Sequence, residues 1–187
     1  HVMVDPRTQT RPMPSGGTVS PRAVPGTYTV RLSVGQAELS RTLIVKKDPN
    51  SAGSEADIEA QVAMSLEVRD SLNTLMDMIN QIEWIRRQVY DVSALLIGTD
   101  YVEEVLSAGD ALDGKLIAVE EQLFQINQTP GADFWRWKTV LYGKLLEFSS
   151  SLTATWGAGG HDFPPTTQHV EVHELLKGRL ADYHAQL

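Results

Sequence analysis

The chain has 187 residues, a hydrophobic content of 42% and a formal net charge of −8, and it contains no cysteine. This length is sufficient for one hydrophobic core with a small appendage. The negative charge and the lack of a basic cluster argue against nucleic acid or an anionic membrane as a partner. Disulfides and thiolate metal sites are excluded, and no apolar run reaches the roughly 20 residues that span a bilayer.

The first quarter of the chain predicts a proline-rich leader and then a β-hairpin. Prolines recur from residue 1 to 25, where they prevent regular hydrogen bonding. Apolar and polar residues then alternate from Thr27, and again from Glu38 to Lys46 after the tight-turn pair Gly35-Gln36. The apolar face consists of Tyr28, Val30, Leu32, Val34, Leu39, Leu43 and Val45.

This hairpin face needs a cover, because a two-stranded sheet alone is marginally stable in water. We expect the cover to be the start of the following helix, at Ile58, Val62 and Leu66, or strands outside the chain. The chain also opens without Met on a Pro/Gly-rich stretch, and we therefore expect it to be part of a longer protein.

The stretch from Ser54 to Leu96 predicts one long helix around which the other helices pack. Ser54 is a suitable N-cap with Asp57 as the capping-box acid, and Gly98 follows the expected end. At about 1.5 Å per residue this helix spans roughly 60 Å, more than any later helix can match. Arg86 lies in its apolar stripe and is expected to pair with a carboxylate across the bundle. The stripe contains Leu72, Leu75, Ile79, Ile82 and Val89.

Three shorter helices are predicted after this one. They extend from Asp100 to Asn127, from Asp133 to Trp156, and from the Thr166 cap to the end of the chain. In the first of these helices the inward residues are expected to be Leu112, Leu116, Val119, Leu123 and Ile126. In the second they are expected to be Phe134, Leu141, Leu145, Phe148 and Leu152. In the last they are expected to be Val172, Leu176, Leu180, Tyr183 and Leu187.

The predicted fold is mainly α, an antiparallel up-down four-helix bundle with an N-terminal β-hairpin. Residues 1–49 would form the leader and hairpin, and residues 50–187 the bundle. We expect one shared core that includes Leu72, Ile79, Ile82, Val119, Leu145, Phe148 and Leu176.

Candidate catalytic and metal-binding residues are sparse. His169 and His173 have the four-residue spacing that lets two imidazoles share a metal, but a third ligand would have to come from elsewhere. Helical acids could be paired for glycoside chemistry, although such carboxylates are usually solvated. These acids are Glu103, Glu104, Asp110, Asp113, Glu120 and Glu121. We predict no intrinsic hydrolase activity, no stoichiometric metal and no cofactor.

The densest aromatic and cationic cluster lies between residues 134 and 138. It consists of Phe134, Trp135, Arg136, Trp137 and Lys138. Phe134 is assigned to the core stripe, so Trp135 and Trp137 cannot both point inward with it. Exposed aromatic side chains next to arginine are typical of protein-binding hot spots and of sugar-stacking surfaces. We therefore take Trp135, Arg136, Trp137 and Lys138 as candidate binding residues.

Two parts of the sequence resemble a known family. The run Val24-Pro25-Gly26-Thr27-Tyr28-Thr29-Val30-Arg31-Leu32, with Leu43-Ile44-Val45 and Asp48-Pro49, is similar to the Ig-like segment after the β-propeller of large secreted bacterial proteins. These proteins carry BNR or sortilin (VPS10)-like repeats and are often labelled glycosyl hydrolases. The chain is also similar to the helical tail of that family at Arg69-Asp70, at Ile82 to Arg87, and above all at Pro165-Thr166 with Gln168, Val172, Leu176 and Leu180. Trp135 and Trp137 depart from the family.

The resemblance implies that the hairpin is an Ig-like remnant and that any glycosidase chemistry lies in an absent propeller. We expect a non-catalytic C-terminal accessory, docking or assembly module of a secreted or cell-envelope protein. Its partner would be that propeller, another protein or a glycan. The alternative is an independent protein- or glycan-binding helical module that uses residues 134–138. The oligomeric state is left open.

Overall fold

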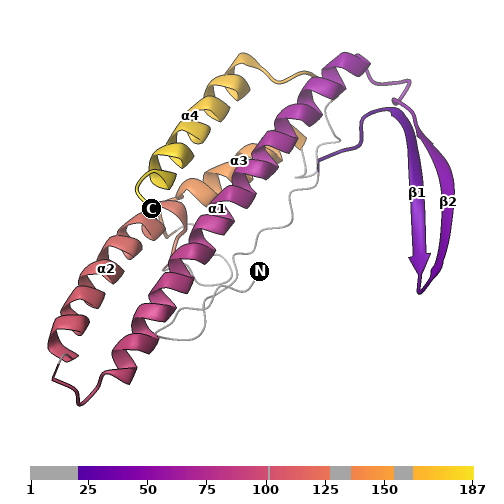
Figure 1. Ribbon diagram of the computed structural model, residues 1–187. Coiled ribbons are helices and arrows are strands. Elements are labelled where there is room, and N and C mark those ends of the chain that lie inside the picture. Colours follow the sequence, from indigo (N-terminus) through magenta and orange to yellow (C-terminus); the bar gives the residue numbers. More distant parts are fainter. Residues whose placement is uncertain (1–20, 101, 127–135, 154–161) are drawn as a thin grey trace.

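The computed structural model describes residues 21–100, 102–126, 136–153 and 162–187, and Figure 1 shows their arrangement. The predicted class is confirmed: the protein is mainly helical, with four helices in contact, preceded by an antiparallel two-stranded hairpin. The elements are β1 (Gly26–Val34), β2 (Ala37–Val45), α1 (Glu55–Leu95), α2 (Val102–Leu123), α3 (Leu141–Thr153) and α4 (Thr167–His184). Within the described ranges, no helix is both long and apolar enough to cross a membrane.

The capping box predicted at the start of α1 is present. The Asp57 backbone N–H donates to Ser54 Oγ at 3.1 Å, and the Ser54 N–H donates to the Asp57 carboxylate at 2.8 Å. The Ser54 backbone N–H, together with the Ser54 side chain, stabilises the ionised carboxylate and lowers the pKa of Asp57. Beyond the other end of the helix, Gly98 has a φ of 87°, in the left-handed region that glycine adopts without strain.

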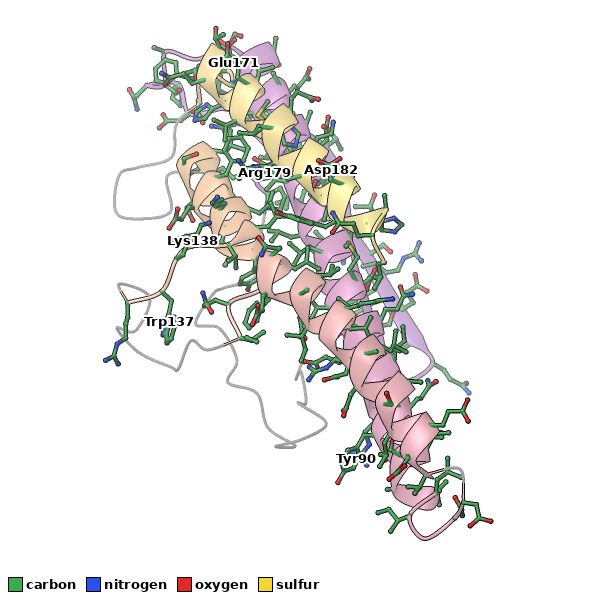
Figure 2. The ribbon with its side chains drawn as sticks, turned by 90° about the vertical axis from the view of Figure 1, so that its left-hand side faces the viewer. Tyr90, Trp137, Lys138, Glu171, Arg179 and Asp182 are labelled. Carbon is green, nitrogen blue, oxygen red and sulfur yellow. The ribbon has the colours of Figure 1, made fainter. Side chains whose placement is uncertain are left out.

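The length of α1 is matched by two helices in tandem. Figures 1 and 2 show α2 and then α3 lying along α1, and α4 beside the half that α3 occupies. Gly109 of α2 lies against Val89 near the end of α1, while Gln61 near its start donates to the Leu152 carbonyl of α3 at 2.7 Å. Both α2 and α3 are thus antiparallel to α1. The 41 residues of α1 are covered by helices of 22 and 13 residues in succession, an arrangement that periodicity did not predict.

The prediction that seven apolar residues share one core is confirmed. All seven expected residues belong to one buried cluster, and Ile79, Ile82 and Leu145 have no exposed surface. Two residues expected to face inward do not: Leu112 and Val172 are exposed. Their neighbours Asp113 and His173 are buried in their place. Asp113 pairs with Arg86 of α1, and His173 lies near Glu67 of α1. The other apolar residues predicted to face inward on the regular turns of α2 and α4 stay buried, namely Leu116, Val119, Leu123, Leu176 and Leu180.

The third predicted helix begins later than expected. Residues 136–140 are not helical, and α3 starts at Leu141 rather than at Asp133, which lies outside the described residues together with Phe134. The Lys138 carbonyl accepts a hydrogen bond from the Gln125 side chain at 3.3 Å instead of taking part in a helical ladder. A tertiary contact therefore holds this segment against the end of α2.

The hairpin forms with the predicted face but without the predicted cover. Tyr28 lies opposite Leu43 and Leu32 opposite Leu39, and Gly35 makes the turn with a φ of 60°. Six residues of this face are 37% to 66% exposed, and Val45 at the end of β2 is half-buried. No described helix contacts either strand, as Figure 1 illustrates.

The prediction that the hairpin docks on the first turns of α1 is therefore wrong for the described residues. Ile58 and Val62, which were expected to carry the hairpin, are buried without its help. Gly53, between the hairpin and α1, packs so closely on the Asp162 carbonyl that a Cβ atom would overlap it. The chain that leads into α4 thus occupies space beside the start of α1, where the hairpin was expected.

Candidate functional site

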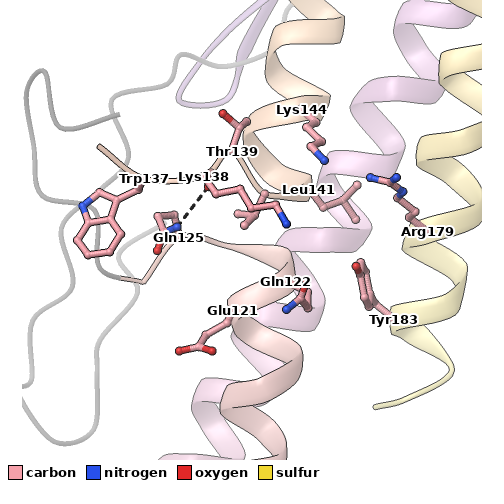
Figure 3. Close-up of a pocket in the computed structure, with 11 residues that line it drawn as sticks. Glu121, Gln122, Gln125, Trp137, Lys138, Thr139, Leu141, Lys144, Arg179 and Tyr183 are labelled. Atoms are coloured by element: carbon pink, nitrogen blue, oxygen red, sulfur yellow. Dashed lines mark hydrogen bonds between the residues drawn. The ribbon is translucent and has the colours of Figure 1, made fainter. Parts of the chain in front are cut away.

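A cleft of about 330 Å³ lies where the end of α2, the segment before α3, and the C-terminal half of α4 meet (Figure 3). The end of α2 is held to the start of α3 by the rings of Phe124 and Tyr142, whose centroids are 5.5 Å apart in an edge-to-face contact. Burial raises the pKa of Tyr142. The cleft is lined by Glu121, Gln122, Gln125, Trp137, Lys138, Thr139, Val140, Leu141, Lys144, Arg179 and Tyr183.

Two of the four predicted binding residues line this cleft. Trp137 is 38% exposed, in agreement with the expectation that it is not fully buried, and Lys138 follows it along the wall. Arg136 is exposed and does not line the cleft. Trp135 lies outside the described residues. Figure 3 shows Trp137 at one end of the cleft and Arg179 at the opposite end.

The cleft concentrates positive charge from three elements. Lys138 comes from the segment before α3, Lys144 from α3 and Arg179 from α4, whereas Glu121 is the acidic residue in the lining. None of the three cations forms an ion pair with a residue of the described ranges. Sequence reasoning missed Lys144 and Arg179, because they are isolated polar residues on two helices and only the packing of α3 on α4 brings them to Lys138. Tyr183 was predicted to face the core, and it also lines the cleft.

The two histidines considered for a metal have separate structural roles. His169 closes the capping box of α4: its Nδ1 accepts from the Thr166 N–H at 3.2 Å, and its own N–H donates to Thr166 Oγ1 at 3.2 Å. His173 is buried, 3% exposed, and stacks on the ring of Phe148 with an interplanar angle of 10°. No group of three His, Asp or Glu side chains suited to a metal ion occurs among the described residues.

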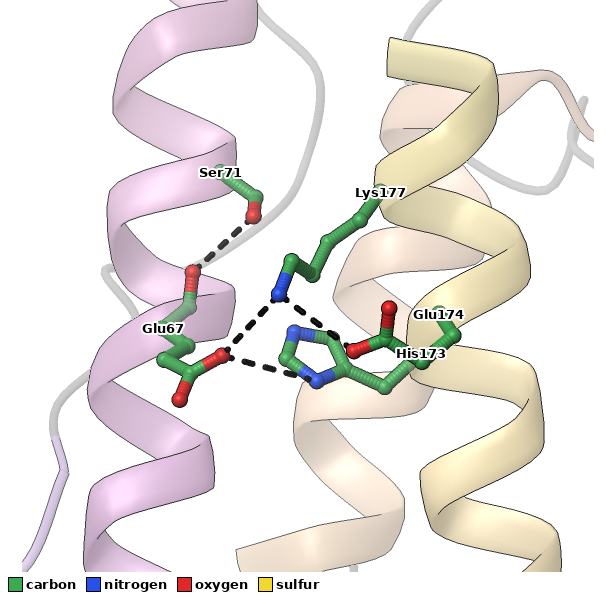
Figure 4. A network of polar contacts seen from close by, with 5 residues as sticks. All are labelled: Glu67, Ser71, His173, Glu174 and Lys177. Atoms are coloured by element: carbon green, nitrogen blue, oxygen red, sulfur yellow. Dashed lines mark hydrogen bonds and ion pairs between the residues drawn. The ribbon is translucent and has the colours of Figure 1, made fainter. Parts of the chain in front are cut away.

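His173 lies beside a charged network between α1 and α4, drawn in Figure 4. Its Nδ1 is 3.9 Å from a carboxylate oxygen of Glu67, and that carboxylate is 3.4 Å from Lys177 Nζ. Lys177 is also 3.3 Å from Glu174 on its own helix. Burial is the main influence and lowers the pKa of His173 from its usual 6.5, although Glu67 and Glu174 oppose this shift.

We expect the lowered pKa of His173 to make the protein less stable in mild acid. The unfolded chain then binds more protons than the folded one, so the free energy of unfolding falls as the pH decreases below about 6.5. Urea unfolding between pH 7.5 and 5 should show this slope, and His173→Leu should flatten it. His184→Gln, at an exposed position of the same helix, is the matched control. An unchanged slope in His173→Leu would contradict the assignment.

Two of the acids considered for glycoside chemistry are bound to a buried arginine. Arg86 Nε donates to Asp113 Oδ1 at 2.7 Å, and Arg86 Nη1 donates to Glu120 Oε2 at 3.1 Å. The side chain of Glu120 is fully buried and that of Arg86 nearly so. The prediction that Arg86 pairs across the bundle is confirmed, and these two carboxylates stabilise α1 against α2.

The chain matches no protein-family model, no curated protein and no solved structure. The resemblance to the helical tail of propeller proteins therefore stays a prediction.

Proposed function

We propose that the chain is a non-catalytic C-terminal accessory module that serves docking or assembly in a larger secreted β-propeller protein. The observation that supports this role is the uncovered apolar face of the hairpin. The parent protein, its secretion and the position of the module within it are proposed from the resemblance alone.

The hairpin is the part of the described structure that lacks a second layer. Its strands pair over nine residues each, yet Val30, Leu32 and Leu39 are more than half exposed. A two-stranded sheet gains independent stability from further strands or from a helix against its apolar face. The helices, in contrast, share a buried core to which no hairpin residue contributes. The hairpin is therefore the element best suited to join this module to another domain or protein.

Hydrogen exchange tests the docking role. In this 187-residue chain, the amides of β1 should exchange much faster than those of the core segment of α1, because no described helix covers the sheet. In the proposed longer protein, the amides from Tyr28 to Val34 should become protected. Full protection of β1 in the chain as given would overturn the proposal, since the hairpin would then need no partner.

A pair of variants locates the docking face. Leu32→Lys places a charge on the apolar face of β1 and should abolish protection of the hairpin in the longer protein. Thr29→Lys, on the opposite face of the same strand, should leave the protection intact. Both variants should keep the unfolding midpoint of the helices, because none of the four described helices contacts β1. Equal protection in the two variants would argue against docking through the apolar face.

The alternative function is an independent protein- or glycan-binding helical module. It is supported by the position of Trp137 and Lys138 in the cleft, where an aromatic ring and a cation are accessible together. We propose no enzymatic activity for this chain.

A further inference from the structure

The cleft is the place where positive charge gathers in an acidic protein. The chain carries a net charge of −8, yet Lys138, Lys144 and Arg179 line one hollow. Figure 3 shows these three side chains around the space next to Leu141. Like charges held near one another repel, and no carboxylate of the described residues forms an ion pair with any of them.

We propose that the cleft binds a small polyanion, a molecule with at least two carboxylate or phosphate groups, between Lys138, Lys144 and Arg179. This inference deepens the binding-module alternative by naming its ligand class, and it does not depend on docking of the hairpin. Arginine presents a planar fork that matches a carboxylate or phosphate, and the two lysines supply mobile point charges on the other side.

The rest of the lining fits a ligand of this kind. Gln122 and Tyr183 place an amide and a phenol beside the cations, as Figure 3 shows, and both groups can donate hydrogen bonds to an anion. Trp137 offers an accessible ring at the other end of the cleft for the apolar part of the ligand. A volume of about 330 Å³ is at the lower end of small-molecule sites, which favours a small anion over a macromolecule.

Calorimetric titration of the intact chain at low ionic strength tests the proposal. The probes are inorganic pyrophosphate, for phosphate groups, and citrate, for carboxylates, with acetate as a singly charged reference. At least one of the two polyanions should bind with one-to-one stoichiometry, and acetate should not. Whichever of pyrophosphate and citrate binds more tightly identifies phosphate or carboxylate as the natural group.

Matched variants locate the site. Arg179→Gln and Lys144→Gln should each weaken binding about tenfold, which corresponds to about 1.4 kcal/mol. Lys115→Gln, an exposed position of α2 outside the cleft, should change the dissociation constant less than twofold. If Arg179→Gln lowers the melting temperature, the dissociation constant of Lys144→Gln, a variant in α3, can be compared with that of the native chain instead.

Three results would overturn the inference. The first is that neither polyanion binds at millimolar concentration. The second is that Lys115→Gln weakens polyanion binding as much as the cleft variants do. The third is that acetate at equal ionic strength displaces the bound polyanion completely. If neither polyanion bound while a neutral oligosaccharide bound equally well to the native chain and to Arg179→Gln, the inference would be overturned and the binding-module alternative would remain. Failure of the polyanion titration leaves the hydrogen-exchange test of the hairpin unaffected.

Discussion

Replacing Arg86 with methionine is expected to lower the free energy of unfolding by about 3 to 5 kcal/mol, the range found when one member of a buried ion pair is removed. Arg86 lies within 2.7 Å of Asp113 and 3.1 Å of Glu120, so two carboxylates would lose their cation. Glu120 has no exposed side-chain surface, and water cannot replace the missing charge. Urea unfolding at pH 7 measures the change.

The neighbouring residue provides the control. Arg87 pairs with Asp91 at 3.1 Å on the exposed side of the same helix. Arg87→Met should therefore cost less than about 1 kcal/mol, as exposed ion pairs do. The double variant Arg86→Met with Glu120→Leu should regain part of the loss, because one buried charge is removed with the other. Equal losses for Arg86→Met and Arg87→Met would mean that burial of the network contributes nothing.

Ile79→Ala is expected to cost about 2 to 5 kcal/mol, because it leaves a cavity in a closely packed core. Ile79 has no exposed surface and belongs to the cluster that joins α1 to the three other helices. The same urea experiment should show a lower midpoint with an unchanged slope, since the denatured state is little affected.

Leu95→Ala is the comparison for this core variant. Leu95 lies in the last turn of α1 and is 81% exposed, so its truncation should change the free energy of unfolding by no more than about 0.5 kcal/mol. If the midpoint of Ile79→Ala stayed at the native value, the buried face assigned to α1 would be incorrect.

Local features were predicted well because they depend on residues close together in the chain. The capping boxes join residues three apart, Ser54 with Asp57 and Thr166 with His169, and the first of them was predicted with both partners. The register of the hairpin follows from the Gly35-Gln36 turn. The stripe of α1 identified the buried face, including Arg86, because helical period alone brings its members to one side.

Contacts between distant segments were predicted less well. The sequence indicated that Arg86 needs a carboxylate. It did not indicate that α2 is oriented with Asp113 and Glu120 buried and Leu112 exposed, because this orientation depends on how the two helices pack. The apolar face of the hairpin indicated that another element should cover it, but the face alone does not identify that element. The segment before α3, which was predicted to be helical, instead accepts a hydrogen bond from Gln125 at the Lys138 carbonyl.

The helical class, the hairpin, the cap of α1 and the seven shared core residues could be predicted from the sequence, because hydrogen bonds and apolar periodicity within one element carry that information. The tandem position of α2 and α3 along α1, and the hairpin face that no described helix covers, depend on how separate elements pack and could not be predicted in this way. The same holds for the cleft. Lys138, Lys144 and Arg179 come from separate elements, and only the packing of those elements places their charges around one space.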